Sequence, residues 1–194
     1  MRINRWLLAA LLVVALIIGA GGVIASTAVN RYTSTDAFCT SCHTMAMQAD
    51  DPFFQHSAHI ANADGVQPSC GDCHIPRNNW FIETYTHVSS GTRDVIAEFT
   101  HNFSDPKVWA AHRAALAAET RAQMKAQDSV TCRSCHDASA IHPTSDAGRQ
   151  AHALLLKGNV TCVDCHMNLV HPPAQSTAQS KVDETRGRRD SAAN

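Results

Sequence analysis

Four Cys-x-x-Cys-His motifs account for every cysteine in this chain of 194 residues. In such a motif the two thiols add across the vinyl groups of a haem, and the adjacent histidine binds the iron from one face. The sequence therefore predicts four covalently attached haem c groups. The motif residues are Cys39, Cys42 and His43; Cys70, Cys73 and His74; Cys132, Cys135 and His136; and Cys162, Cys165 and His166.

Zinc knuckles, disulfides and a redox dithiol are the competing interpretations of paired cysteines. None of the three requires a histidine directly after the second cysteine of each pair. With 8 Cys and 12 His in 194 residues, composition alone would place roughly 0.02 such motifs in the chain. Four motifs with no cysteine left over therefore favour haem attachment.

An uncharged segment from Trp6 to Val29 is long enough for a helix to cross a hydrocarbon core of about 30 Å. Arg2 and Arg5 precede it, so the positive-inside rule predicts a single-pass inner-membrane protein with a cytoplasmic N-terminus and a periplasmic haem domain. A cleaved signal peptide is the alternative, because Ser26-Thr27-Ala28 is a tolerable cleavage site. The apolar run exceeds the about 7 to 15 residues of such peptides, which favours a retained anchor over residues 1–30.

Residues 31–175 are expected to form a tetrahaem domain, followed by a disordered tail over 176–194 in which Val182 is the one sizeable apolar residue. About 145 residues are few for four porphyrins, so the haems should supply much of the apolar core. The formal net charge of −1 becomes more negative with the haem propionates. Nucleic acid is therefore not an expected partner.

The motifs are spaced as two pairs. The first cysteines of successive motifs lie 31, 62 and 30 residues apart. His59 and His152 each lie 20 residues after the first cysteine of a pair. This pattern favours a diverged duplication with halves of about 31–100 and 101–175, in which His59 and His152 have the same role.

The expected fold is mainly α with much irregular structure: one transmembrane helix and a small haem-cored multihaem cytochrome c domain. Pro106 can start a helix that Ser104 or Asp105 caps. Further helices are expected over 79–99 and 146–157. No run of alternating apolar residues suggests a sheet.

Distal iron ligands are expected among the eight histidines outside the motifs, because low-potential electron-carrying haems are commonly held by two histidines. The repeat favours His59 and His152, and closeness to a motif favours His171. His87, on the expected helix 79–99, is a candidate with less support. The other four histidines are expected to be surface or hydrogen-bonded residues: His56, His101, His112 and His142.

Met45 stands two residues after His43. A thioether can replace imidazole as a haem ligand, whereas the alternative role for a methionine here is packing. The residues leave open whether Met45 or His43 binds the first iron.

The anchor, the four motifs and the start Cys39-Thr-Ser-Cys-His43-Thr-Met45 together resemble the NapC/NirT/NrfH family of membrane-anchored tetrahaem quinol dehydrogenases. The similarity covers about residues 1–173. Further stretches that look like the family are Ser57-Ala-His59 with Asp64-Gly65-Val66, Arg113-Ala-Ala-Leu116, and Cys162-Val-Asp-Cys-His166 with His171.

The resemblance also implies distal ligands: His59 for the fourth haem and His171 for the third. In the structurally known branch a lysine serves the second haem, seven residues before an aspartate. Here His87 holds that position, seven residues before Asp94. The repeat instead favours His152 for the second haem, and the choice between His87 and His152 stays open.

By the same resemblance Met45 would bind the first iron, and Asp94 would approach its far face. The implied function is oxidation of membrane quinol, menaquinol or ubiquinol, with electrons passed to a periplasmic reductase in anaerobic respiration. Asp94 is the candidate proton acceptor, and His87 could hydrogen-bond the other quinol oxygen. Arg77 and Arg93 are candidates to neutralise haem propionates. Residues that could rest at the membrane interface are Trp80, Phe81, Ile82, Tyr85 and Val88.

Two other functions fit a tetrahaem chain. One is a terminal reductase that binds nitrite, hydroxylamine or a similar small molecule at an open haem. The other is an electron conduit or haem-based sensor without a quinol site. The anchor and the membrane-near first haem favour the quinol dehydrogenase, which could work as a homodimer.

Overall fold

The computed structural model describes residues 4–174, and within them the chain forms α-helices and no β-strand. The mainly α fold class predicted from the sequence is confirmed. The expected tail over 176–194 and Arg2 lie outside the described residues. In chain order the helices are α1 (Arg5–Thr33), α2 (Asp36–Cys39), α3 (His43–Ala49), α4 (Pro52–Gln55), α5 (Cys70–His74), α6 (Trp80–Thr100), α7 (Pro106–Ala126), α8 (Val130–Arg133), α9 (Asp146–Leu156) and α10 (Cys162–Cys165).

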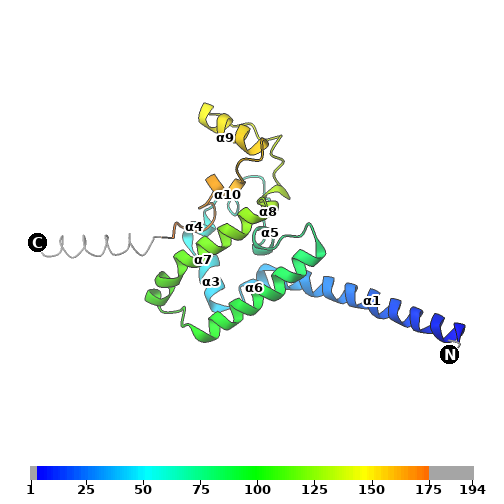
Figure 1. Ribbon diagram of the computed structural model, residues 1–194. Coiled ribbons are helices and arrows are strands. Elements are labelled where there is room, and N and C mark those ends of the chain that lie inside the picture. The colour runs from blue at the N-terminus through cyan, green and yellow to red at the C-terminus, as the bar shows by residue number, and fades with distance from the viewer. Residues whose placement is uncertain (1–3, 175–194) are drawn as a thin grey trace, which may run out of the picture.

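Helix α1 projects away from the other helices (Figure 1). The Asn4 side chain caps it by accepting a hydrogen bond from the backbone N–H of Trp6. Its length and apolar composition are sufficient to cross a membrane, and its most apolar stretch is not buried against the protein. It runs four residues beyond Val29, so that Asn30 reaches the haem domain, where it is buried.

The two longest helices of the haem domain, α6 and α7, are joined by a short connection and run in opposite directions (Figure 1). Asn79 caps α6 by accepting from two backbone N–H groups, and Asp105 caps α7 directly before Pro106. Proline suits this first position because its missing N–H would have no partner there. An ion pair between Arg93 and Glu119 joins the two helices. The helices predicted at 79–99 and from Pro106 are confirmed.

Helix α9 (Asp146–Leu156), coloured yellow in Figure 1, stands at the top of the view. Ser145 caps its start, and Gly158 follows its end with a φ of 75°. This positive φ is readily adopted by glycine and ends the helix. The helix expected over 146–157 is thus present, one residue shorter.

The second motif of each pair begins with the same local structure. In α5 the Ser69 side chain and the Asp72 carboxylate form a capping box, and in α10 Thr161 and Asp164 do the same. A basic side chain pairs with each aspartate: Arg77 with the first, Lys125 with the second. This shared cap supports the proposed duplication.

The first motif of each pair also contacts the second in the same manner. Asp36 accepts a hydrogen bond from the backbone N–H of Cys70 at 2.7 Å, and Ser129 accepts one from that of Val163 at 3.3 Å. Asp36 and Ser129 each lie three residues before the first cysteine of their motif. The two acceptors occupy equivalent positions in the proposed repeat, while the donors differ by one position, since Cys70 is the first cysteine of its motif and Val163 follows one.

Few apolar side chains are buried by protein atoms. Among residues 4–174 the buried apolar side chains are Phe103, Leu155 and Val163, while Asn30 and Ser34 are buried polar residues. A domain of this length normally buries far more apolar surface than three side chains provide. The expectation that haems supply much of the core is consistent with this sparse packing.

Candidate functional site

Three histidines outside the motifs each face a motif histidine. His171 faces His74 with ring centroids 6.2 Å apart, and His152 faces His166 at 6.2 Å. The third pair is His59 and His136, at 6.1 Å. Each pair brings together residues from separate segments of the chain.

The separation of these rings fits a six-coordinate haem iron. An imidazole nitrogen binds a metal ion at about 2.0 Å, and the ring centre lies roughly 1.1 Å behind that nitrogen. Two imidazoles on opposite sides of one iron therefore have centroids about 6 Å apart. The observed 6.1–6.2 Å leaves room for an iron between the rings, so the residues fit haem ligation.

The pairing differs from the expected assignment. His171 faces the second motif rather than the third, and His59 faces the third rather than the fourth. His152 faces the fourth motif rather than the second. The repeat-equivalent histidines thus differ in their partners: His59 lies beside a motif histidine of the other half of the chain, whereas His152 lies beside the second motif histidine of its own half.

Residues near His171 hold its ring in place. Phe54 stacks on it with centroids 5.6 Å apart, and the Arg113 guanidinium donates to the backbone carbonyl of the next residue, Pro172. Burial is the main cause that lowers the pKa of His171, and the charge of Arg113 adds to it. A low pKa keeps the imidazole neutral, which is the form that binds metals.

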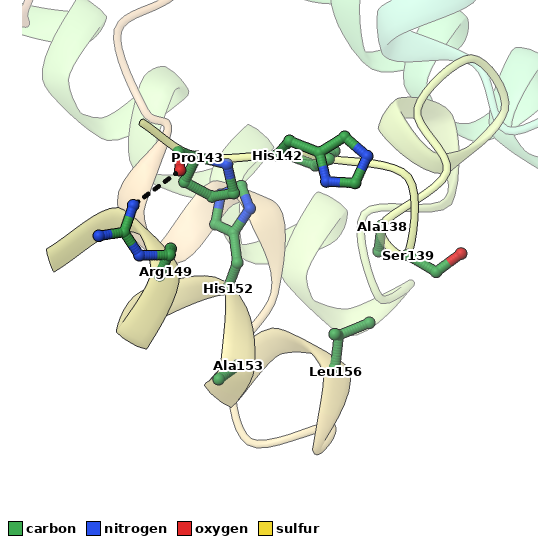
Figure 2. Close-up of a pocket in the computed structure, with 9 residues that line it drawn as sticks. Ala138, Ser139, His142, Pro143, Arg149, His152, Ala153 and Leu156 are labelled. Carbon is green, nitrogen blue, oxygen red and sulfur yellow. Dashed lines mark hydrogen bonds between the residues drawn. The ribbon is translucent and has the colours of Figure 1, made fainter. Parts of the chain in front are cut away.

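A hollow of about 300 Å³ adjoins His152. Figure 2 shows His152 rising from α9 toward the loop that carries Pro143 and His142, with the Arg149 side chain hydrogen-bonded to the Pro143 carbonyl. The Nδ1 atoms of His152 and His171 are buried and have no hydrogen-bond partner in the structure. Buried ring nitrogens without a partner are costly, and a group that completes the site would relieve that cost.

The first motif has different surroundings. His43 lines a hollow of about 440 Å³ together with residues 98–104, the end of α6 and the turn after it. Met45 lies on the short helix α3 that starts at His43, and its side chain is partly exposed. His101, which the sequence left without a role, lines this hollow, and its Nδ1 atom lies 2.9 Å from Thr100 Oγ1.

His87 contacts oxygen atoms with both ring nitrogens. Its Nε2 atom lies 3.0 Å from Ser34 Oγ, and its Nδ1 atom lies 3.0 Å from the Glu83 carbonyl oxygen. Among the described residues its ring does not pair with a motif histidine as the three distal histidines do. Of the two roles expected for His87, hydrogen bonding is the one that this geometry favours.

Asp94 lies on the same face of α6 as His87 and Glu98, which are seven residues before and four residues after it. Desolvation is the main cause that raises the pKa of Asp94. Glu119 and Glu98 raise the pKa further, while Arg93 opposes them. The carboxyl therefore binds a proton more readily than an ordinary aspartate.

Cysteine thiols of successive motifs lie close to one another in space. The Cys39 thiol lies close enough to Cys70 to raise the pKa of the Cys70 thiol. After burial, Cys162 likewise contributes to the raised pKa of Cys132. Cys73 lies close enough to Cys132 to interact electrostatically. Neighbouring motifs in the sequence are thus neighbours in space, from the first to the fourth.

A family model described as the NapC/NirT cytochrome c family, N-terminal region, matches residues 1–176. The chain belongs to the NapC/NirT cytochrome c family. As a member of this family it is a c-type cytochrome with covalently bound haem c, and its class of function is electron transport. The resemblance seen in the sequence is confirmed.

Several named relatives are similar to this NapC/NirT family member. TorY of Escherichia coli O157:H7 is 34% identical over 168 residues, which are 84% of this chain and 44% of the relative. TorC of E. coli K12 is 34% identical over 190 residues, 94% of this chain and 47% of the relative. NapC of Haemophilus influenzae is 32% identical over 156 residues, 78% of this chain and 76% of the relative.

The family member therefore spans less than half the length of these TorY and TorC relatives. No solved structure matches the chain significantly. Residues that sequence reasoning missed are those whose role depends on a distant partner: Asp36, Ser129, Arg113 and His101. For Arg113 the signal was present, since it stands in a stretch that resembles the family, but nothing in the sequence identified Pro172 as its partner.

Proposed function

We propose that this cytochrome is a tetrahaem quinol dehydrogenase that is anchored in the inner membrane and passes electrons to a periplasmic reductase. One observation carries the proposal: the first motif begins six residues after α1 ends, and α1 packs against α6. Asn30 donates to Thr84 Oγ1 at 2.9 Å, and Ser34 contacts His87. These contacts support a quinol site near the end of α1, on the helix that also carries Asp94.

Quinol oxidation releases two electrons and two protons, so the site needs a proton acceptor. Asp94 would accept one proton, because its raised pKa makes its carboxylate a stronger base than an ordinary aspartate. His87 would hydrogen-bond the second quinol oxygen through Nε2, with that oxygen taking the place of Ser34 Oγ while the Glu83 carbonyl continues to orient the ring through Nδ1. The role of Asp94 requires its carboxyl to be ionised before quinol binds.

Four haems, one for each motif, would carry the electrons singly when bound. The three histidine pairs would each hold the iron of the second, third or fourth motif between two imidazoles, and a haem held in this way would supply electron transfer without binding substrate. Met45 or His43 would hold the first iron. Electrons would pass from the first motif to the fourth, because successive motifs adjoin, and leave for the reductase.

The membrane arrangement follows from charge. Arg2 and Arg5 before the apolar segment favour a cytoplasmic N-terminus and a periplasmic haem domain. A terminal reductase of a small nitrogen compound is the second candidate, favoured by the hollow of about 440 Å³ beside His43. Turnover of nitrite or hydroxylamine by the purified protein would support that candidate.

The test is the Asp94→Asn variant in proteoliposomes. We expect reduction of the haems by a quinol to slow roughly 100-fold, the contribution of a general base, while reduction by dithionite is unchanged. In the wild type the rate with quinol should fall as the pH drops through the raised pKa of Asp94, since protonated Asp94 accepts no proton; the variant should lack this decline.

Asp64→Asn serves as the control, because Asp64 is exposed on a turn outside α6, where its backbone N–H donates to Asn62. It should behave as the wild type with both reductants. Quinol kinetics that are unaltered in Asp94→Asn would remove Asp94 from the mechanism.

A further inference from the structure

Helix α6 exposes apolar side chains along one face from its first turn to its last. Successive members are one, three or seven residues apart, and together they cover one face of a helix with 3.6 residues per turn. Their exposed fractions run from 40% at Ile82 to 88% at Phe99. We call this surface the α6 apolar face: Phe81, Ile82, Tyr85, Val88, Val95, Ile96 and Phe99.

The opposite face of α6 is polar and holds the residues of the proposed site. Glu83, His87, Asp94 and Glu98 are spaced by four, seven and four residues, so they share one face. This division of one helix into an apolar and a charged face is typical of helices that lie in a membrane interface. An exposed apolar patch of this extent also marks an interaction surface.

The α6 apolar face is continuous with the membrane anchor. α6 meets α1 where Asn30 contacts Thr84, one residue before Tyr85 of the apolar face. Tyr32, in the last turn of α1, is also exposed and packs edge-on against Phe38 at 5.6 Å. Exposed tyrosines at the end of a membrane helix favour the boundary between lipid and water.

We propose that the α6 apolar face rests in the same bilayer that holds α1, and that its far end guides the isoprenoid tail of quinol to the first haem site. Phe99 connects the two, because it belongs to the α6 apolar face and also lines the hollow beside His43. The part that concerns quinol rests on the proposed function. The bilayer is favoured over a second copy of the chain because the face begins at the anchor itself.

Photo-crosslinking of the full-length holoprotein tests the lipid contact. Benzoylphenylalanine replaces Phe81, Tyr85 or Phe99 in separate variants, in liposomes of phosphatidylethanolamine and phosphatidylglycerol. We expect mass spectrometry to find phospholipid adducts at all three positions. The control is the same replacement at Leu154, an exposed apolar residue on α9, which should form none.

Two results would contradict a lipid contact along the whole α6 apolar face. Crosslinks between two copies of the chain would assign the α6 apolar face to a dimer instead. Absence of lipid adducts at Phe99, with adducts at Phe81, would limit the membrane contact to the first turns of α6.

The Val95→Gln variant tests guidance of the tail, since Val95 lies on the α6 apolar face one turn before Phe99. It should slow reduction by a quinol with an isoprenoid tail about fivefold more than reduction by a tail-less quinol, because a buried apolar side chain contributes about 1 kcal/mol or more to such contacts. The control is Val66→Gln, at an exposed valine far from α6 in the sequence. It should have the same small effect on reduction by the two quinols.

Equal slowing of both quinols by Val95→Gln would refute guidance of the tail. If the wild type is reduced by neither quinol, the proposed function fails. The crosslinking result would still decide the lipid contact, so the two failures are distinguishable.

Discussion

His152 and His166 face each other across a space that fits one iron, and this ring separation of 6.2 Å has a direct spectroscopic consequence. We expect His152→Ala to leave four covalently attached haems but to turn one of them from low-spin to high-spin, because that iron loses its second imidazole. Electron paramagnetic resonance of the oxidised protein measures the change.

His112→Ala provides the matched control for His152→Ala. His112 also lies on a helix, but its ring packs against His101 and Phe103, and its Nδ1 atom contacts the Val108 carbonyl. Its loss should leave all spin states unchanged. A low-spin spectrum in His152→Ala would mean that another group binds the iron of the fourth motif.

At the scale of elements, α5 packs closely on the end of α1 at Gly71. A Cβ atom at this position would lie 2.5 Å from the backbone oxygen of Ser34 and 2.8 Å from its Cβ atom. Ser34 is buried and contacts His87. Because the clash is with backbone, Gly71→Ala should destabilise the holoprotein by about 1–3 kcal/mol and lower its melting temperature by roughly 3–10 °C.

Gly91→Ala is the opposite case, because nothing lies within 4 Å of a Cβ atom built on this glycine in α6. Alanine is the better helix former by about 1 kcal/mol, so this variant should melt at a higher temperature. Calorimetry of both holoproteins compares them. Equal melting temperatures would show that α5 and α1 separate more easily than the packing at Gly71 indicates.

The sequence predicted the helices well, because the residues that start and end each helix are close to it in the sequence. Asn79 and Asp105 cap α6 and α7 through neighbouring N–H groups, and Gly158 follows the end of α9 with a positive φ. The structure pairs the histidines outside the motifs with other motif histidines than the sequence suggested, because this pairing depends on distant contacts. Nothing near His171 in the sequence indicates that it faces His74, 97 residues earlier.

At the scale of the whole molecule, two of the expected haems connect the halves of the chain. His59 of the first half faces His136 of the second, and His171 of the second half faces His74 of the first. The pair of His152 and His166 lies within the second half. With three buried apolar side chains among the described residues, the protein atoms alone provide little to hold the halves together.

This arrangement predicts different consequences for the loss of different haems. Replacing Cys132 and Cys135 by Ala removes the third haem and, with it, the link between His59 and His136. We expect limited proteolysis to cleave this variant rapidly between the halves, near residue 101. Replacing Cys162 and Cys165 by Ala removes the fourth haem, and protection should then be lost mainly around α9, because the two connecting haems remain.

Hydrogen exchange measured by mass spectrometry gives the matching readout without a protease. Loss of the third haem should raise exchange in both halves, since each half contributes one histidine to that haem. Loss of the fourth haem should raise exchange over 137–171. Equal patterns in the two variants would mean that the halves hold together through protein contacts such as Arg93 with Glu119. An exposed ion pair of this kind contributes about 0–1 kcal/mol, which is too little to replace a haem that binds a histidine from each half.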